Sequence, residues 1–359
     1  MLKKIDKYII KKFLGTFLFS IILIIVIVIV FDISEKIDDF IQKDAPLKLI
    51  IFDYYLNFIP YFVNMFSPLF TFISVIFFTS KLAGDSEIIA MLTSGISFKR
   101  LLRPYLISAG IICLMSLLLS NFIMPKSNEK RINFEDKYIR SSYNMSDRNL
   151  HLQTRPGEFV FFESFNLDNN SGFRFTYEKI KNGKLIYKIS SDIIVWDTLS
   201  KNWIVKNYVE KHINNFGEKV RLGNEKKIQL HIKPTDLTDK IYNIETMNYF
   251  ELNEFINKEK IKGTEYIQFY FIEKYKRIAF PFATIILTII GFTLSSKRTR
   301  GGIGLNIGIG ITLSFSFILF MQVSTTFATY GTLNPFMAVW IPNIIFGFLS
   351  IFLIYKAPK

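Results

Sequence analysis

The chain has 359 residues, half of them hydrophobic, and a formal net charge of +14. Residues 126–266 contain 24 Lys and Arg and 20 Asp and Glu, so this polar middle carries only +4 of that charge, and the rest lies beside two apolar blocks. Because the basic residues flank apolar runs instead of lining one soluble face, the composition argues against nucleic acid as a partner and indicates an integral membrane protein with an inserted soluble domain.

The first apolar block runs from Phe13 to Ser120 and opens with the uncharged segment Phe13–Phe31. This segment is long enough to cross a hydrocarbon core of about 30 Å as a helix. A cleaved signal peptide is the alternative, but the apolar run is longer than the hydrophobic region of a signal peptide. An acidic stretch, Asp32–Asp39, follows it where a small-residue cleavage site would be needed. A spanning helix is therefore predicted.

Further apolar stretches bring the number of predicted spans to six. The other five lie near residues 51–79, 105–124, 278–294, 303–323 and 336–355. An even number places both termini on one side of the membrane, and Lys and Arg mark that side as cytoplasmic. The basic clusters are Lys3, Lys4, Lys7, Lys11 and Lys12; Lys81, Lys99, Arg100 and Arg103; Lys297, Arg298 and Arg300; and Lys356 and Lys359. The polar middle is then predicted to lie on the opposite face.

The loop between the second and third spans is the most informative one. Acidic residues at its start and a glycine near its end predict a short amphipathic helix, because acids are favoured in a first helical turn and glycine ends helices. Its apolar face needs a partner. A helix lying on the bilayer surface, with Lys99 and Arg100 contributing, is the alternative. The candidate interaction residues are Asp85, Ser86, Glu87, Ile88, Met91, Leu92, Ser94 and Gly95.

The polar middle predicts an antiparallel β domain, either a sandwich or an open barrel. Its β-branched and aromatic runs alternate with Asn, Gly and Asp turn signals near 168–172 and 181–184. The predicted strands are 158–165, 173–177, 184–196, 203–209 and 227–232.

The sequence contains few patterns that are typical of catalytic or metal-binding sites. No Ser/His/Asp or paired-carboxylate pattern stands out, so no catalytic residues are predicted. The histidines His151, His212 and His231 lack ligand spacing, so no metal site is predicted either. The lone Cys113 lies within an apolar run and is expected to fill space. The β domain is therefore interpreted as a binding or conduit module.

The second apolar block, Phe269–Tyr355, contains the glycine-rich segment Gly301–Gly310. This segment has neither the GxGxxG register nor a P-loop, so no nucleotide site is predicted. Gly304 and Gly308 form a GxxxG pair, which lets two helices approach closely in lipid, and helix packing is their predicted role.

Four segments and the overall layout resemble the LptF/LptG permeases. The segments are 6–13, 86–97, 276–282 and 334–343, and the layout is three spans, a β domain and three more spans. The resemblance implies an α-helical polytopic membrane protein with six transmembrane helices and an inserted all-β periplasmic jelly-roll-like domain. It divides the chain into helices 1–3 with a cytoplasmic coupling helix (1–125), the β domain (126–266) and helices 4–6 (267–359), in the bacterial inner membrane.

The function that the resemblance implies is that of a permease subunit of an ABC transporter, which extracts lipopolysaccharide from the inner membrane and passes it to a periplasmic bridge. The implied partners are a cytoplasmic ABC ATPase dimer, a paralogous permease subunit, a periplasmic jelly-roll protein and lipopolysaccharide. No cofactor is implied, and a separate subunit hydrolyses ATP. In the family the loop helix docks on the ATPase, and Glu87 matches its glutamate. F and G types are not separated, and a membrane-anchored envelope enzyme or a non-transporting scaffold are the alternatives.

The stretch after the first span departs from the family pattern. Family members place basic residues there to meet lipid phosphates, whereas here the stretch is mostly acidic and Glu35 stands at one of the lysine positions. Lys36 and Lys43 are the candidate substrate-binding residues. A divalent ion that bridges carboxylates to phosphates, or a substrate with fewer phosphates, are the alternatives.

Overall fold

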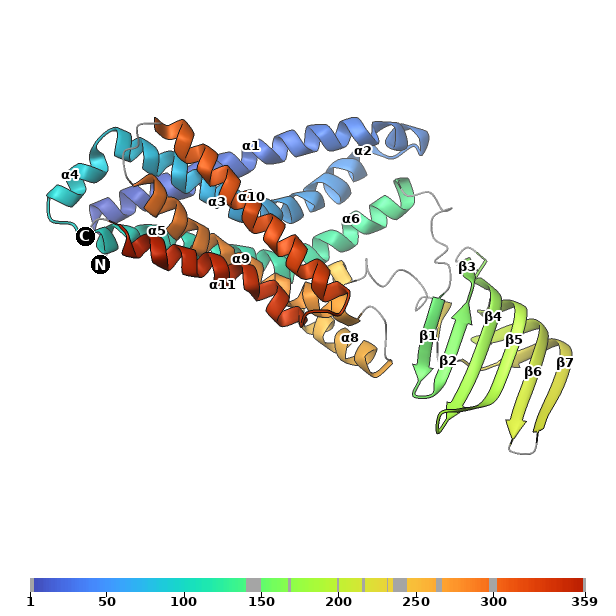
Figure 1. The fold of residues 1–359 in the computed structure, drawn as a ribbon. Coiled ribbons are helices and arrows are strands. Elements are labelled where there is room, and N and C mark those ends of the chain that lie inside the picture. The colour runs from blue at the N-terminus through green and yellow to red at the C-terminus, as the bar shows by residue number, and fades with distance from the viewer. Residues whose placement is uncertain are drawn as a thin grey trace. The chain divides into compact units, whose positions relative to one another are not determined.

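The computed structural model describes residues 3–139, 150–166, 169–198, 200–214, 217–230, 232–234, 244–262, 267–296 and 302–357. The chain divides into two compact units. One comprises Met1–Ile139 and Gln268–Lys359, and the other is Arg140–Ile267. Figure 1 shows that the first unit is helical and that the second contains a β-sheet.

Among the described residues, six helical runs are long and apolar enough to cross a membrane, as the hydropathy pattern predicts. Two of these runs contain a π-helical segment. In chain order the helices of this unit are α1 (Lys4–Gln42), α2 (Leu47–Leu49), η1 (Ile50–Tyr55), α3 (Leu56–Gly84), α4 (Glu87–Thr93), α5 (Phe98–Leu118), η2 (Leu119–Ile123), α6 (Met124–Tyr138), α9 (Ile267–Ser295), α10 (Gly302–Thr329) and α11 (Pro335–Tyr355).

Helix α3 lies at the centre of the helical unit and contacts both α1 and α10. One side of α3 contributes Val75 and Phe78 to a core shared with α1, α4 and α5. Its other side contributes Phe72 and Ile76 to a core shared with α9, α10 and α11. The bundle is therefore organised as two apolar layers on either side of one helix, each built by residues at helical spacing.

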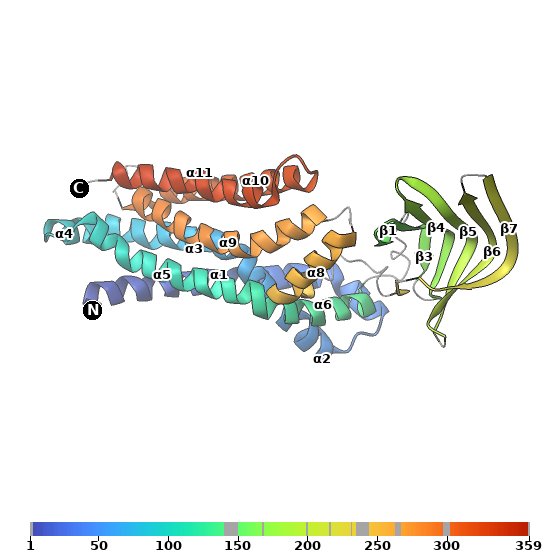
Figure 2. The ribbon, with the colours of Figure 1, turned by 90° about the horizontal axis from the view of Figure 1, so that it is seen from below.

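The second unit contains one antiparallel sheet with the strand order β1-β2-β4-β5-β6-β7, and the short strand β3 also pairs with β4. The strands are β1 (Leu150–Arg155), β2 (Glu158–Phe162), β3 (Ser164–Asn166), β4 (Ser171–Lys181), β5 (Lys184–Asp197), β6 (Asn202–Asn214) and β7 (Gly217–Ile228). This unit also contains α8 (Tyr249–Lys262). Figure 2 shows that the sheet curls strongly, as in an open barrel. The prediction of an inserted antiparallel β domain is confirmed.

The last predicted strand, 227–232, is wrong. Strand β7 ends at Ile228, and most of it lies earlier, in the highly charged stretch from Gly217. The buried Leu230 and Ile232 follow the strand and close the core instead. The indole Nε1 of Trp203 donates a hydrogen bond to the backbone oxygen of Ile232 at 2.8 Å, which fixes this closing segment. His231 and the predicted turn residue Asp168 lie outside the described residues.

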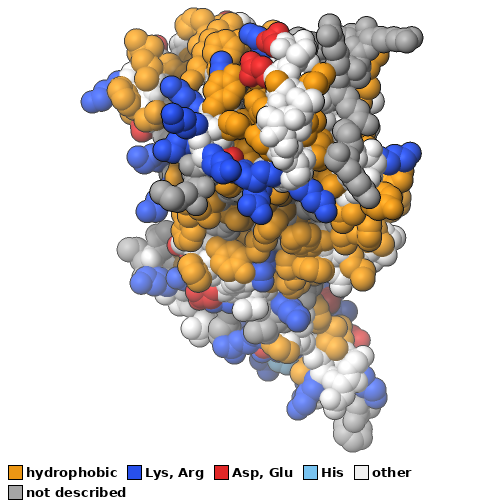
Figure 3. All heavy atoms as spheres, turned by 90° about the vertical axis from the view of Figure 1, so that its left-hand side faces the viewer, with side chains coloured by type: hydrophobic (Ala, Val, Ile, Leu, Met, Phe, Trp, Pro, Cys, Tyr) orange, Lys and Arg blue, Asp and Glu red, His pale blue; other side chains and the backbone are white. Residues whose placement is uncertain are grey.

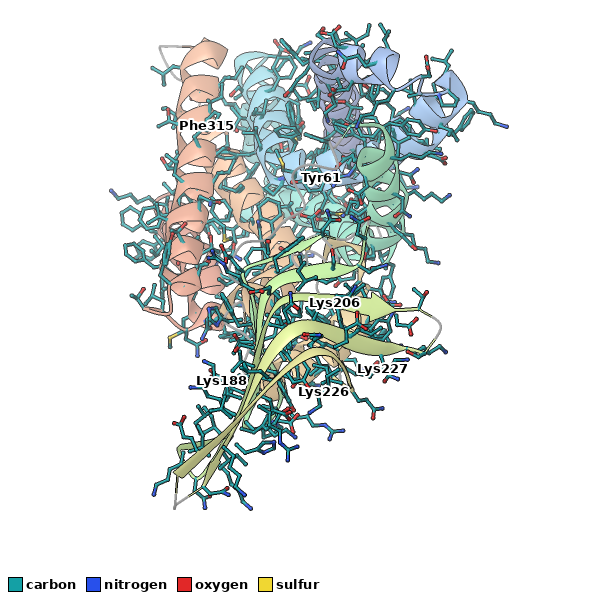
Figure 4. The ribbon with its side chains drawn as sticks, turned by 90° about the vertical axis from the view of Figure 1, so that its right-hand side faces the viewer. Tyr61, Lys188, Lys206, Lys226, Lys227 and Phe315 are labelled. Carbon is teal, nitrogen blue, oxygen red and sulfur yellow. The ribbon has the colours of Figure 1, made fainter. Side chains whose placement is uncertain are left out.

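The sheet has an apolar core and a charged surface. Phe162, Phe175 and Trp203 are fully buried and pack within one cluster. Several lysines of β5, β6 and β7 are labelled in Figure 4. These lysines have acidic partners on other strands of the sheet: Lys188 with Glu178 at 2.7 Å, Lys206 with Glu225 at 3.7 Å, Lys226 with Glu210 at 2.6 Å and Lys227 with Asp197 at 3.9 Å. Ion-paired lysines on a sheet are typical of a solvated protein surface and offer little free positive charge.

Candidate functional site

Helix α4 lies at the same end of the helical unit as both chain ends (Figure 1). We call this end the basic end; it consists of Lys3–Lys12, α4 and Phe98–Arg103. Figure 3 looks onto it and shows Lys and Arg side chains gathered across it. The predicted short helix exists and covers seven residues, Glu87–Thr93.

The two ends of α4 are set by backbone geometry. Ser86 precedes the helix in a left-handed conformation, with φ of 61°, and Asp85 caps the end of α3. After the helix, the backbone N–H of Ile96 donates to the oxygen of Met91 and that of Gly95 donates to Leu92. This is a Schellman motif, which needs a left-handed residue after the helix, and Gly95 supplies it with φ of 89°. Gly95 therefore ends α4, as predicted.

The apolar face of α4 is largely covered by the chain's own helices. Ile88 is 1% exposed and belongs to the core of α1, α3 and α5, and Met91 and Leu92 are half-buried against that core. Ile89 is 48% exposed and Glu87 is half-buried. The surface of α4 that is left for a partner is therefore a narrow one, which combines an apolar side chain with a carboxylate.

Two polar contacts tie α4 and its neighbourhood to the start of α1. The hydroxyl of Tyr8 donates to Oε2 of Glu87 at 3.4 Å. The guanidinium of Arg100 donates two hydrogen bonds of 2.7 Å to the two carboxylate oxygens of Asp6. The backbone N–H of Lys3 donates to the same carboxylate at 2.8 Å. Sequence reasoning missed Asp6 and Arg100 as a pair because 94 positions separate them; the one available signal is an acid among the basic residues before the first span.

At the opposite end of α1, Lys36 is held by an internal network. Its Nζ lies 2.7 Å from Oδ1 of Asp32, one helical turn earlier, and also donates to the hydroxyl of Tyr54. The hydroxyls of Tyr54 and Tyr55 donate to Oδ2 of Asp32 at 3.0 and 3.2 Å. A π-helical turn, η1, carries both tyrosines. Lys36 is thus a partly neutralised cation.

Lys43 lies further along the chain. It is the exposed residue that follows the last turn of α1, about two helical turns beyond Lys36. The acidic side chains of the same stretch differ in their surroundings. Glu35 and Asp38 are exposed, whereas Asp32 accepts hydrogen bonds from the two tyrosines and Lys36. Across the described part of the chain, no three His, Cys, Asp or Glu residues come together in a way that could hold a metal ion.

Among the residues that the structure describes, the predicted packing pair, Gly304 and Gly308, packs against no neighbouring helix at the position of an added Cβ. A Cβ at either position would meet no atom within 4 Å, and both residues are exposed on α10. The close helix contacts that the chain does make run through other glycines. A Cβ on Gly310 would collide with Ile76, and one on Gly291 would press on Phe72, so α10 and α9 both depend on glycine to approach α3.

No curated protein matches this chain. A family model does match, and its match covers nearly the whole chain, from residue 7 to residue 356, including both helical segments and the sheet between them. The family is described as "Lipopolysaccharide export system permease LptF/LptG", and the chain belongs to this family.

Proposed function

We propose that the protein is the transmembrane permease subunit of an ABC transporter, that it extracts lipopolysaccharide from the inner membrane and that it passes this lipid to a periplasmic bridge. The observation that carries the proposal is the family match over residues 7–356. The six spans, the inserted β domain and the short helix α4 at the basic end all support it. ATP hydrolysis then belongs to a separate subunit, which docks as a dimer against this chain and a paralogous permease.

The proposed orientation places both termini and α4 in the cytoplasm and the β domain in the periplasm. The excess of Lys and Arg at the basic end supports it, because short cytoplasmic loops carry the positive charge. Cysteine labelling in a Cys113→Ala background tests it. Lys181→Cys, at the exposed end of β4, should react in cells with an intact inner membrane, whereas Ser94→Cys should react only after permeabilisation. The reverse pattern would invert the orientation.

Helix α4 is the proposed contact with the ATPase. Glu87 offers a half-buried carboxylate and Ile89 an exposed apolar side chain, a combination that suits a basic residue beside an apolar groove on the partner. Asp85, Ser86, Ser94 and Gly95 would shape the two ends of the helix. In the absence of the ATPase, the Tyr8 hydroxyl occupies Glu87, so docking would exchange a neutral donor for a cationic one.

Copurification tests the proposed function most directly. The full chain, tagged and extracted from its own membrane, should bring down an ATPase and a second permease. Glu87→Ala should weaken ATPase binding by about 1.5–3 kcal/mol, the usual cost of one lost charge-assisted contact. Glu35→Ala, an exposed acid at the opposite end of α1, is the matched control and should leave binding unchanged. If the chain copurifies with no ATPase, the transporter proposal fails and the scaffold alternative gains.

Lys36 and Lys43 are the proposed contacts with lipid phosphates. Lys36 already forms an ion pair with Asp32. To bind Lys36, a lipid phosphate would have to replace the Asp32 carboxylate as its counter-ion. Crosslinking of lipopolysaccharide to the reconstituted chain should fall sharply in Lys36→Glu/Lys43→Glu. Undiminished crosslinking would leave both lysines as helix anchors at the membrane surface.

A further inference from the structure

The first turns of α1 are attached to both sides of α4. Asp6, on the first turn of α1, is 3% exposed and receives both guanidinium bonds of Arg100, on the first turn of α5. Two residues later in α1, Tyr8 contacts Glu87, the first residue of α4. The loop that carries α4 is therefore fixed to α1 where it begins and where it returns to the bundle.

The chemistry of the Asp6–Arg100 contact selects one geometry. Two parallel N–H···O bonds to one carboxylate set the direction of the guanidinium as well as its distance. At the basic end, an arginine would otherwise be attracted by anionic lipid headgroups. Burial of Asp6 offsets part of its attraction to the partly exposed Arg100, so the pair contributes more to specificity than to stability. The bidentate contact with Asp6 favours Arg100 over the other basic residues of this end as the cation beside α1.

An apolar contact beneath the ion pair joins the same elements. Ile9 of α1, Ile88 of α4, and Phe98 and Leu101 of α5 are all almost completely buried in one cluster. Three elements that are separate in the sequence therefore share a packed core with a directional ion pair at its edge. Contiguous networks of this kind can transmit a displacement between sites.

Helix α1 connects this cluster to the opposite end of the unit without interruption. It runs from Lys4 to Gln42, which corresponds to a length of about 58 Å, and it contains no proline. The spans α3, α5, α9 and α11 each contain an internal proline, which weakens a helix as a rigid rod. Asp32 and Lys36, which form an ion pair, are on the distal part of α1.

We propose that Asp6 and Arg100 are positioning residues that combine the start of α1, helix α4 and the start of α5 into one coupling unit. A displacement of α4 then moves the amino-terminal end of α1, and the continuous helix carries this movement to Asp32 and Lys36. The inference rests on the proposed function, in which α4 is the contact with the ATPase, and it adds a path from that contact to the proposed lipid site.

The first test needs no ATPase. In a Cys113→Ala chain, cysteines replace Tyr8 and Glu87 and are joined by a short bismaleimide in native membranes. Asp6→Asn or Arg100→Gln should lower the crosslinking yield several-fold, and the charge swap Asp6→Arg/Arg100→Asp should restore it. Arg103→Gln removes an exposed cation one turn further along α5 and should have no effect. An unchanged yield in Asp6→Asn would overturn the proposal, because the apolar cluster alone would then hold α4.

The second test measures coupling in proteoliposomes that contain the full chain with the ATPase and the second permease that copurify with it. Asp6→Asn should keep ATPase binding and ATP hydrolysis but release about twofold to thirtyfold less lipopolysaccharide per ATP, the range for substitutions along a coupling path. The charge swap should recover release. A parallel loss of hydrolysis and release, without rescue by the swap, would assign the pair a purely structural role and overturn the proposal. If the wild-type chain binds no ATPase, the proposed function fails while the crosslinking test still decides whether the contact exists.

Discussion

The availability of a lysine at the end of a span for binding an anion depends on which side chains of the protein already contact it. The sequence identifies Lys36 by its place after an apolar run, but it does not reveal that two consecutive tyrosines converge on the neighbouring Asp32. Consecutive residues of an α-helix point about 100° apart and rarely reach one group. The π-helical turn η1 brings both hydroxyls to one carboxylate, and the local sequence does not predict a π-helical turn.

Removal of the Asp32 charge should therefore loosen this network. Asp32→Asn leaves Lys36 without its anionic partner and weakens the acceptor of Tyr54 and Tyr55, so the free energy of unfolding should fall by about 1–3 kcal/mol. Denaturation of the purified chain in detergent measures this change. Glu35→Gln, an exposed acid three residues further along the same helix, should unfold like the wild type. Equal stabilities of the two variants would show that Asp32 contributes nothing through its contacts.

Glu210 in strand β6 gives the β domain a predictable pH dependence. Burial by itself raises the pKa of this carboxyl, but hydrogen bonds from Lys226 and Tyr187 outweigh burial and hold the pKa below its ordinary value of 4.5. A lowered folded pKa means that the carboxylate stabilises the fold above pH 4.5 and that this stabilisation is lost as pH falls through the folded pKa. At neutral pH, Glu210→Gln should lower the free energy of unfolding by about 1–2 kcal/mol, since Lys226 is partly exposed. The difference from the wild type should shrink below pH 4.5 in chemical denaturation experiments; a constant difference would contradict the assignment.

Among the elements, the sequence predicts those with strong local signals. The loop helix is predicted by its acidic start and by Gly95, and the structure places it at Glu87–Thr93. Strand β7 is missed because its residues are mainly Lys, Glu and Gly, and tertiary pairing with the apolar strand β6 outweighs its poor strand propensity. Periodicity predicts that α4 has an apolar face. It does not predict which neighbouring helices cover that face.

Gly95 should be required for the shape of α4. Its φ of 89° lies in the left-handed region, where a side chain is strained, so Gly95→Ala should cost about 1 kcal/mol or more and fray the last turn of the helix. Gly84, at the end of α3, is the control: a Cβ there meets nothing within 4 Å and its backbone is helical, so Gly84→Ala should be neutral or slightly stabilising. Protease sensitivity of the loop in membranes distinguishes the two. Equal cleavage rates in both variants would mean that α4 does not need its C-terminal motif.

For the whole molecule, hydropathy predicts the number of spans and the place of the inserted sheet, because both depend on composition over long windows. Contacts between distant segments are not predictable in this way. The pairing of Asp6 with Arg100 and the approach of Gly310 to Ile76 depend on how helices are arranged, which one sequence does not reveal. The length of α1 is a third example. The helix continues from Phe31 to Gln42 through charged residues, supported by the i,i+4 pair of Asp32 and Lys36.

The exposed glycines of α10 make a prediction about assembly. A Cβ on Gly304 or Gly308 would meet no atom of the described residues within 4 Å, so a packing role for this pair requires a helix of another subunit. Gly304→Leu/Gly308→Leu should leave the thermal stability of the isolated chain unchanged and reduce copurification of the second permease. Gly310→Leu is the matched contrast on the same helix: its side chain would collide with Ile76, so the isolated chain should lose about 1–3 kcal/mol of stability. If the double variant still copurifies with the second permease at wild-type yield, then this face of α10 is in contact with lipid, and the subunits meet through other helices.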